Sequence, residues 1–271
     1  MSESRGPRKT LDPRLVAGGI DVWLTRMSAA SDELVERCRG GLAPDEVAAC
    51  AKFHHEADRR RAVVTRALVR ATLSRYMSVP PGSWRFEQGA HGRPEIAAPA
   101  GTGLRFNVSH TREIVVCAVA RGTDVGVDVE RFESTHDLRS IASNVCSVRE
   151  LEAMRAMAPD AFARRLLALW TLKEAYLKAR GVGFSLAPRH LTFDLGADAR
   201  MNVSFGPEAS DEPTRWWFAT IDAGGGHLLS IALQCAVAPT HCTVFEADAD
   251  GTGVRTIAPQ FLRTSSPTFP A

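Results

Sequence analysis

Residues 124–130, a stretch that decides how this part of the chain folds, read Asp124-Val125-Gly126-Val127-Asp128-Val129-Glu130. The valines recur at every second position, a period that predicts a half-buried β-strand. Asp128 and Glu130 then project from the same face, with their Cα atoms about 6.5–7 Å apart. Two carboxylates this close repel each other unless a cation lies between them. Carboxylate oxygens suit Mg²⁺, and the simpler alternative is a strand with a solvated acidic face.

A second stretch lies in a helix predicted over 162–179 and reads Trp170-Thr171-Leu172-Lys173-Glu174-Ala175-Tyr176-Leu177-Lys178. Glu174 and Lys178 are four residues apart and therefore share one face of that helix. The simple interpretation is an exposed ion pair, which stabilises a helix by only about 0.3–0.5 kcal/mol. The apolar residues around the pair favour a position beside a cleft instead. We therefore predict Glu174 as a third oxygen ligand and Lys178 as the partner of a phosphate.

Three further stretches offer hydrogen-bond donors or positive charge. The strand predicted over 104–108 leads into Ser109-His110-Thr111, which suits phosphate oxygens, although an ordinary polar turn has the same composition. The helix predicted over 58–76 begins with Arg59-Arg60-Arg61, which suits a terminal phosphate or forms a solvated face. Gly92-Arg93-Pro94 lies in a loop predicted over 89–103, whose backbone can approach a flat base.

The order of predicted elements repeats once along the chain. Each half gives a strand, a short helix, a long helix and then further strands, with little residue identity between the halves. We therefore predict an α+β fold made of two similar subdomains of ordinary domain size. The predicted boundaries are a flexible leader over 1–14, an N-terminal subdomain over 15–123, a C-terminal subdomain over 124–239 and a poorly ordered tail over 240–271.

The composition is that of a globular chain. Of its 271 residues, 45% are hydrophobic and 24% are charged, and 33 basic against 31 acidic residues leave a net charge of +2. That balance gives no reason to expect a nucleic-acid partner. The six cysteines form no C-x-x-C pair and indicate buried thiols in a reducing compartment rather than a zinc site. We expect no signal peptide and no membrane span, hence a cytoplasmic protein.

Taken in order, these stretches resemble the motifs of the Sfp-type 4′-phosphopantetheinyl transferases. The resemblance rests on 106–110, 126–130 and 170–178, and Ser147-Val148-Arg149-Glu150 is similar to a further S-x-x-E element of that family. Gly92-Arg93-Pro94 and 53–61 are similar to two weaker elements. The resemblance implies a monomer built as a pseudo-dimer of two similar α+β halves, with coenzyme A in the cleft between them.

The resemblance also implies roles for the charged residues. Asp128, Glu130 and Glu174 are expected to hold Mg²⁺, with Mn²⁺ as an alternative. Lys178 is expected to contact the phosphates and to neutralise charge that builds on the pyrophosphate during the reaction. Glu150 and Glu174 are both candidates for the carboxylate that removes the proton of the acceptor serine.

For coenzyme A itself, the resemblance implies contacts from Ser109 and His110, from Arg61, and from the Gly92-Arg93-Pro94 loop around the 3′-phosphate and adenine. The family's usual lysines before this basic element are absent here, where the chain is acidic or neutral. We therefore expect Lys52 and the Arg59–Arg61 cluster to hold the 3′-phosphate.

The activity implied is transfer of the 4′-phosphopantetheine arm of coenzyme A to a serine of an apo acyl or peptidyl carrier protein, of polyketide or nonribosomal peptide synthesis by preference. A non-catalytic module that binds carrier proteins and a metal-dependent coenzyme A hydrolase are the alternatives. Because carriers are typically acidic around their serine, we expect a basic surface near the cleft. The candidates for that surface are Arg149, Arg155, Arg164 and Arg165.

Overall fold

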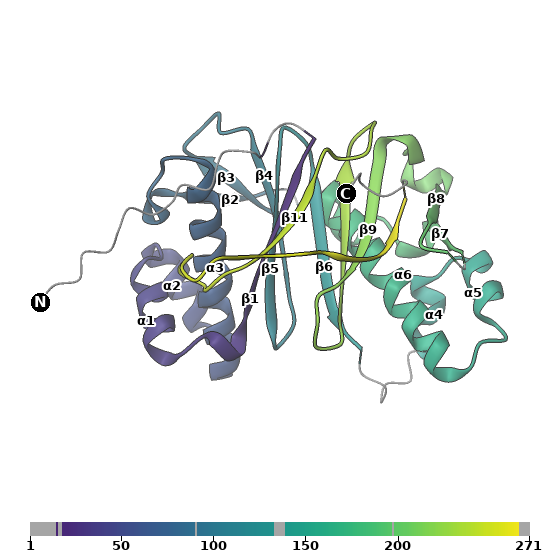
Figure 1. The fold of residues 1–271 in the computed structure, drawn as a ribbon, viewed down its shortest axis with the longest axis horizontal. Coiled ribbons are helices and arrows are strands. Elements are labelled where there is room, and N and C mark those ends of the chain that lie inside the picture. The colour runs from purple at the N-terminus through teal and green to yellow at the C-terminus, as the bar shows by residue number, and fades with distance from the viewer. Residues whose placement is uncertain (1–14, 16–17, 90, 133–138, 197, 266–271) are drawn as a thin grey trace, which may run out of the picture.

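The structure is a computed structural model, and it describes residues 15, 18–89, 91–132, 139–196 and 198–265 (Figure 1). The leader predicted over 1–14 lies outside the described residues. The N-terminal half contains β1 (Ile20–Arg26), α1 (Asp32–Gly40), α2 (Pro44–Ala51), α3 (Glu56–Tyr76), β2 (Arg85–Gln88), β3 (Pro94–Ala98), β4 (Leu104–His110) and β5 (Ile114–Arg121). The predicted loop over 89–103 was therefore wrong in one respect, because it contains β3, which pairs with β2.

The C-terminal half repeats this order element by element. It contains β6 (Val125–Arg131), α4 (Arg139–Val145), α5 (Val148–Met154), α6 (Pro159–Arg180), β7 (Leu191–Leu195), β8 (Met201–Phe205), β9 (Trp216–Asp222) and β10 (His227–Gln234). Short 3₁₀ turns lie at Met27–Ala29, Pro81–Ser83, Gly183–Ser185, Pro188–His190, Pro207–Ala209 and Pro213–Arg215. The predicted repetition is thus confirmed in the element order.

The strand registers of the two halves also correspond. Strands β1, β5 and β4 are neighbours in one sheet, and β6, β10 and β9 are neighbours in the other. Arg26 pairs with Ile114 at the start of β5, and Arg131 pairs with His227 at the start of β10. Counting back from these pairs, Trp23 of β1 occupies the position that Asp128 occupies in β6.

Helices cover the outer faces of two sheets that pack against each other (Figure 1). Side chains of β5 alternate: Val115, Cys117 and Val119 face the core under α3, whereas Ile114, Val116 and Ala118 face the core between the sheets. The same period places Val125, Val127 and Val129 of β6 between the sheets. The core under α6 contains Leu169, Leu172, Tyr176 and Phe218. The order of layers is therefore helix, sheet, sheet, helix.

The tail predicted to be poorly ordered over 240–271 instead forms β11 (Cys242–Glu246), β12 (Arg255–Ile257) and β13 (Gln260–Thr264). Strand β11 lies parallel to β1 in the first sheet, and β13 pairs antiparallel with β9 in the second. In Figure 1 the yellow end of the chain crosses both sheets. The prediction was wrong because such short strands carry little periodicity, and their order comes from partners distant in the sequence.

Within the part of the chain that the structure describes, we find no helix with the length and apolar character needed to cross a membrane.

Candidate active site in the cleft between the halves

Strand β6 and helix α6 pack closely enough to bring their charged residues together. Gly126 makes this possible, because a Cβ at that position would lie 1.9 Å from the carbonyl oxygen of Ala175. As predicted, Asp128 and Glu130 share the face of β6 opposite the buried valines. Glu174 and Lys178 come from α6 and line the same cavity as these two carboxylates.

Asp128 is the most constrained member of this group, with only 4% of its surface exposed. Its Oδ1 accepts hydrogen bonds from Lys178 Nζ at 2.6 Å and from Ser109 Oγ at 2.8 Å. Lys178 Nζ also donates to Ser109 Oγ at 3.0 Å. The second oxygen of Asp128, Oδ2, is buried and has no hydrogen-bond partner. A buried carboxylate oxygen without a donor is costly, and a cation would satisfy it.

The other two carboxylates are held in an environment that disfavours their charge. Burial, reinforced by the charges of Asp128 and Glu174, raises the pKa of Glu130 to about 7, and a hydrogen bond from Trp170 opposes the shift. Burial and the charge of Asp128 likewise raise the pKa of Glu174. This side of the cleft therefore carries more negative charge than Lys178 alone neutralises.

Positive charge gathers on the opposite side of the same cleft. Burial and the nearby cations Arg61 and Lys178 lower the pKa of His110. Arg61 is held by Asp58, whose Oδ1 lies 2.5 Å from the guanidinium, and Arg112 lines the same cavity. Because a lowered pKa favours the neutral imidazole, the positive charge on this side comes from Arg61 and Arg112, and His110 adds a hydrogen-bonding ring.

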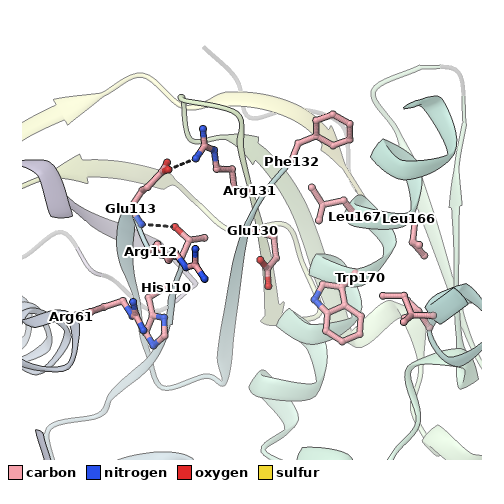
Figure 2. Close-up of a pocket in the computed structure, with 13 residues that line it drawn as sticks. Arg61, His110, Arg112, Glu113, Glu130, Arg131, Phe132, Leu166, Leu167 and Trp170 are labelled. Carbon is pink, nitrogen blue, oxygen red and sulfur yellow. Dashed lines mark hydrogen bonds and ion pairs between the residues drawn. The ribbon is translucent and has the colours of Figure 1, made fainter. Parts of the chain in front are cut away.

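The cleft consists of three connected chambers. The central chamber, of about 380 Å³, contains Asp128, Glu130, Glu174 and Lys178. It shares His110, Glu130 and Trp170 with a wider chamber of about 830 Å³, shown in Figure 2. It shares Glu174 and Lys178 with a third chamber of about 420 Å³, which is lined by the Gly92-Arg93-Pro94 loop. The volume is ample for a ligand larger than an ordinary nucleotide.

Most predicted site residues meet at this cleft. Those that line it are Arg61, Gly92, Arg93, Pro94, Ser109, His110, Asp128, Glu130, Glu174 and Lys178. Lys52 is exposed at the end of α2 and lines none of the three chambers. Arg61 and Gly92-Arg93-Pro94, predicted to face one part of the ligand, line two different chambers.

Glu150, predicted as a candidate base, lies outside the cleft with only 3% of its surface exposed. Its Oε2 accepts from the backbone N–H of Ser147 at 2.7 Å and from Lys173 Nζ at 2.5 Å. Its Oε1 accepts from the backbone N–H of Phe193 at 2.7 Å. The two oxygens therefore tie the start of α5 to α6 and β7. Of the two predicted bases, Glu174 lines the cleft and Glu150 lines none of its chambers.

Two other predicted ligand contacts serve the fold in this structure. Arg93 donates to the carbonyl of Ala179 at 2.6 Å and lies 3.3 Å from Asp124, so its guanidinium holds the end of α6. Ser109 is buried and bonded to Asp128 and Lys178, so its hydroxyl orients these groups.

Sequence reasoning missed the apolar wall of the wide chamber. Trp170 points toward Glu130 in Figure 2, and the wall consists of Phe132, Ile141, Val145, Leu166, Leu167 and Trp170. Ile141 and Val145 belong to α4, a helix that the sequence analysis did not predict. The one hint in the sequence was the position of Phe132, which directly follows the strand predicted to carry Asp128 and Glu130.

The metal prediction is only partly matched by the geometry. Among the described residues no group of three or more His, Cys, Asp or Glu side chains is arranged to hold a metal ion. Even so, Asp128 offers an oxygen without a hydrogen-bond partner, and the raised pKa values of Glu130 and Glu174 show that their negative charges lack compensation. Such carboxylate oxygens suit a hard cation.

Comparison with known proteins agrees with the architecture. Residues 30–122 match the family described as 4′-phosphopantetheinyl transferase, N-terminal, and residues 124–232 match the 4′-phosphopantetheinyl transferase superfamily. The 4′-phosphopantetheinyl transferase HetI of Nostoc sp. is 31% identical over 172 residues, which cover 63% of this chain and 72% of that protein.

Two relatives from Bacillus subtilis match over more of the chain. A 4′-phosphopantetheinyl transferase is 27% identical over 226 residues, covering 83% of this chain and 94% of that protein. The 4′-phosphopantetheinyl transferase Sfp of strain 168 is 26% identical over 209 residues, covering 77% and 88%. With both halves of the cleft matched, the chain belongs to the 4′-phosphopantetheinyl transferase superfamily.

Proposed function

We propose that this chain transfers the 4′-phosphopantetheine arm of coenzyme A to a serine of an apo acyl or peptidyl carrier protein. The observation that carries the proposal is the opposition of two charged sets across one chamber. Burial disfavours the charges of Glu130 and Glu174 beside Asp128, which suits a cation, whereas Arg61 and Arg112, with the imidazole of His110 beside them, suit an anion. A divalent cation bound to a pyrophosphate answers both needs at once.

Asp128, Glu130 and Glu174 are the residues that would hold Mg²⁺, or Mn²⁺, in this chamber. When bound, the ion would withdraw charge from the pyrophosphate oxygens and hold them in place. Lys178 would supply a second positive charge beside the same oxygens, since its ammonium group already lies 2.6 Å from Asp128 and is partly exposed to the chamber. The bound ion would also give Asp128 Oδ2 the partner that it lacks in this structure.

The three chambers suggest how coenzyme A would lie. The adenine end fits the chamber lined by Gly92, Arg93 and Pro94, where Leu177 and Pro188 add apolar surface. The pyrophosphate fits the central chamber beside Lys178. The pantetheine arm fits the wide chamber, whose apolar wall includes Trp170. Arg61 in that chamber then meets a phosphate near His110 rather than the adenine.

The transfer itself is a displacement at phosphorus. The serine oxygen forms a bond to the β-phosphorus of coenzyme A, which bears the pantetheine arm. The bond from that phosphorus to the bridging oxygen breaks, and adenosine 3′,5′-bisphosphate leaves with the electron pair. Glu174, the predicted base that lines the cleft, takes the serine proton. Lys178 stabilises the negative charge that develops on the bridging oxygen.

The carrier would approach through the wide chamber, where Arg112 and Arg131 stand beside the apolar wall. Of the four predicted docking arginines, Arg164 stacks on Phe132 at 4.0 Å, at the edge of this chamber. Arg165 instead donates to the carbonyl of Leu195. We favour Arg164 as the docking residue. We also propose that the partner is a carrier of polyketide or nonribosomal peptide synthesis, and that the enzyme is monomeric and cytoplasmic.

Intact-protein mass spectrometry tests the proposal. An apo carrier mixed with the protein, coenzyme A and Mg²⁺ gains the mass of one phosphopantetheine arm, and EDTA prevents the gain. Asp128→Asn and Glu174→Gln each reduce the rate at least about 1,000-fold while the protein stays folded. Glu87→Gln, at an exposed side chain that lines none of the chambers, keeps the full rate.

Two results would count against this function. Near-normal rates in Asp128→Asn or Glu174→Gln would show that the substituted residue is not a metal ligand. Release of phosphopantetheine without any carrier present would indicate a hydrolase instead.

A further inference from the structure

Strands β4 and β6 meet where the two halves meet, yet each is the last strand of its own sheet. Their junction is made by side chains. Asn107 Oδ1 accepts from the backbone N–H of Val127 at 3.0 Å, and Ser109 Oγ lies 3.4 Å from the backbone N–H of Val129. Edge strands leave such groups without partners unless something covers them. Between β4 and β6, polar side chains of β4 thus take the place of the backbone hydrogen bonds that join neighbouring strands within each sheet.

The same face of the chain continues into Thr111, because residues 107, 109 and 111 alternate with 108 and 110. Thr111 Oγ1 lies 3.2 Å from Nε2 of His227, the first residue of β10 in the other half. His227 is buried, with 3% of its surface exposed. Each of the three polar residues of this stretch therefore contacts the C-terminal half.

The hydrogen-bond roles at the outer contact follow from the neighbouring atoms. Nδ1 of His227 lies 3.0 Å from the carbonyl oxygen of Gly224, which only accepts, so Nδ1 carries the proton. Thr111 Oγ1 already accepts from the backbone N–H groups of Glu113 and Ile114, at 3.1 and 3.2 Å. Nε2 of His227 lies 3.4 Å from Oε2 of Glu113 as well as 3.2 Å from Thr111 Oγ1. His227 therefore contacts two side chains of the turn at 111–113 in the N-terminal half.

The position of this bond matters because two walls of the wide chamber begin there. Residues 110–113 carry His110 and Arg112 on one side, and residues 130–132 carry Glu130 on the other. Arg131 forms an ion pair with Glu113 across the gap and pairs with His227 in the sheet. His227 therefore contacts or adjoins both walls while remaining outside the chamber.

We propose that Asn107, Ser109 and Thr111, closed by His227, form a polar seam that sets the spacing between His110 and Glu130. The Thr111–His227 pair positions these groups for the transfer reaction, and this role rests on the function proposed above. His227 touches neither ligand nor metal and acts only through the two walls. Misplacement of reacting groups by about 1 Å is sufficient for a loss of about 100-fold in rate.

Two pairs of variants test the seam. His227→Phe and Thr111→Val remove the bond with little change of shape, whereas His227→Gln and Thr111→Ser keep an acceptor or a hydroxyl at the same place. Thr25→Val is the control, because Thr25 is buried, donates to the carbonyl of Ala247 at 2.7 Å and lines none of the three chambers.

We expect kcat to fall about 10- to 100-fold in His227→Phe and Thr111→Val, while KM for coenzyme A stays within about threefold. His227→Gln and Thr111→Ser recover most of the loss, and Thr25→Val keeps the kcat of the unmodified protein. A readout independent of activity is hydrogen exchange, which becomes faster in peptides covering 104–114 and 125–132 in the first pair of variants only.

The seam is overturned if both His227→Phe and Thr111→Val keep kcat within twofold, or if Thr25→Val loses as much as they do. If Thr111→Val alone folds, its comparison with Thr111→Ser decides. An unmodified protein without transferase activity would refute the proposed function instead. The exchange of 104–114 and 125–132 would then still decide whether the seam joins the halves.

Discussion

Replacing Gly126 by alanine tests whether the close packing of β6 on α6 creates the cleft. The added Cβ would lie 1.9 Å from the carbonyl oxygen of Ala175 and 2.5 Å from the backbone nitrogen of Ala179. Ordinary contact begins at 3.4 Å, so the helix must move away by about 1.5 Å. Both clashing atoms belong to the helix backbone and cannot be avoided by a change of rotamer.

The size of the effect follows from that displacement. Overpacking a core costs about 1–3 kcal/mol, and a clash with backbone places Gly126→Ala at about 3 kcal/mol. For a chain of this length the melting temperature then falls by about 6–12 °C. Because α6 also carries Glu174 and Lys178, a shift of more than 1 Å reduces kcat about 100-fold in the folded protein.

Urea unfolding and steady-state kinetics measure the two effects separately. Gly40→Ala is the control, because Gly40 lies at the end of α1 with no atom within 4 Å of the added Cβ. That variant keeps its activity, and its stability stays within about 0.5 kcal/mol of the unmodified protein. The packing argument is refuted if Gly126→Ala is as stable as Gly40→Ala.

Two further predictions concern buried charges away from the cleft. Lys173→Met leaves the carboxylate of Glu150 buried without its cation and destabilises the fold by about 3–5 kcal/mol in urea unfolding. Adding Glu150→Gln restores part of that loss. If the effects of the two substitutions on the free energy of unfolding are instead additive, the pairing is contradicted. For Asp211, burial raises the pKa. Hydrogen bonds from the backbone N–H of Glu212 and from the side chains of Trp216 and Tyr176, together with the charge of Arg180, outweigh burial and lower the pKa below its ordinary value of 3.8. Its stabilising contribution is therefore complete above about pH 4 and is lost as pH falls through the lower folded pKa. The free energy of unfolding of Asp211→Asn then declines less steeply in acid than that of the unmodified protein. Parallel declines in the two proteins would exclude Asp211 as a source of acid sensitivity.

Local patterns predicted the parts of the site that lie on one element. Alternation placed Asp128 and Glu130 on one face of β6, and the four-residue spacing placed Glu174 with Lys178 on α6. Ser147 and Glu150, which the sequence analysis named only for their S-x-x-E spacing, form a capping box at the start of α5. In each case the relevant geometry is set by neighbours within a single turn or strand.

What escaped prediction depends on contacts distant in the sequence. Glu150 seemed available for catalysis because its partner Lys173 lies 23 residues away on another helix. Arg61 and Gly92 were assigned to one part of the ligand because no sequence pattern reports on which side of a cleft a loop lies. The chambers are therefore a property of packing rather than of any motif.

Within the described residues, the β4–β6 junction that carries the candidate site has a counterpart of different composition. The counterpart of the β4–β6 junction lies between β9 and β1, where the tail adds β13 to one strand and β11 to the other. There Trp23, at the position of Asp128, stacks on Phe245 of the tail with ring centroids 4.4 Å apart. At equivalent positions the two halves thus carry different groups, a carboxylate at the cleft and an aromatic ring against the tail. The position that holds a candidate metal ligand in one half therefore anchors the end of the chain in the other half.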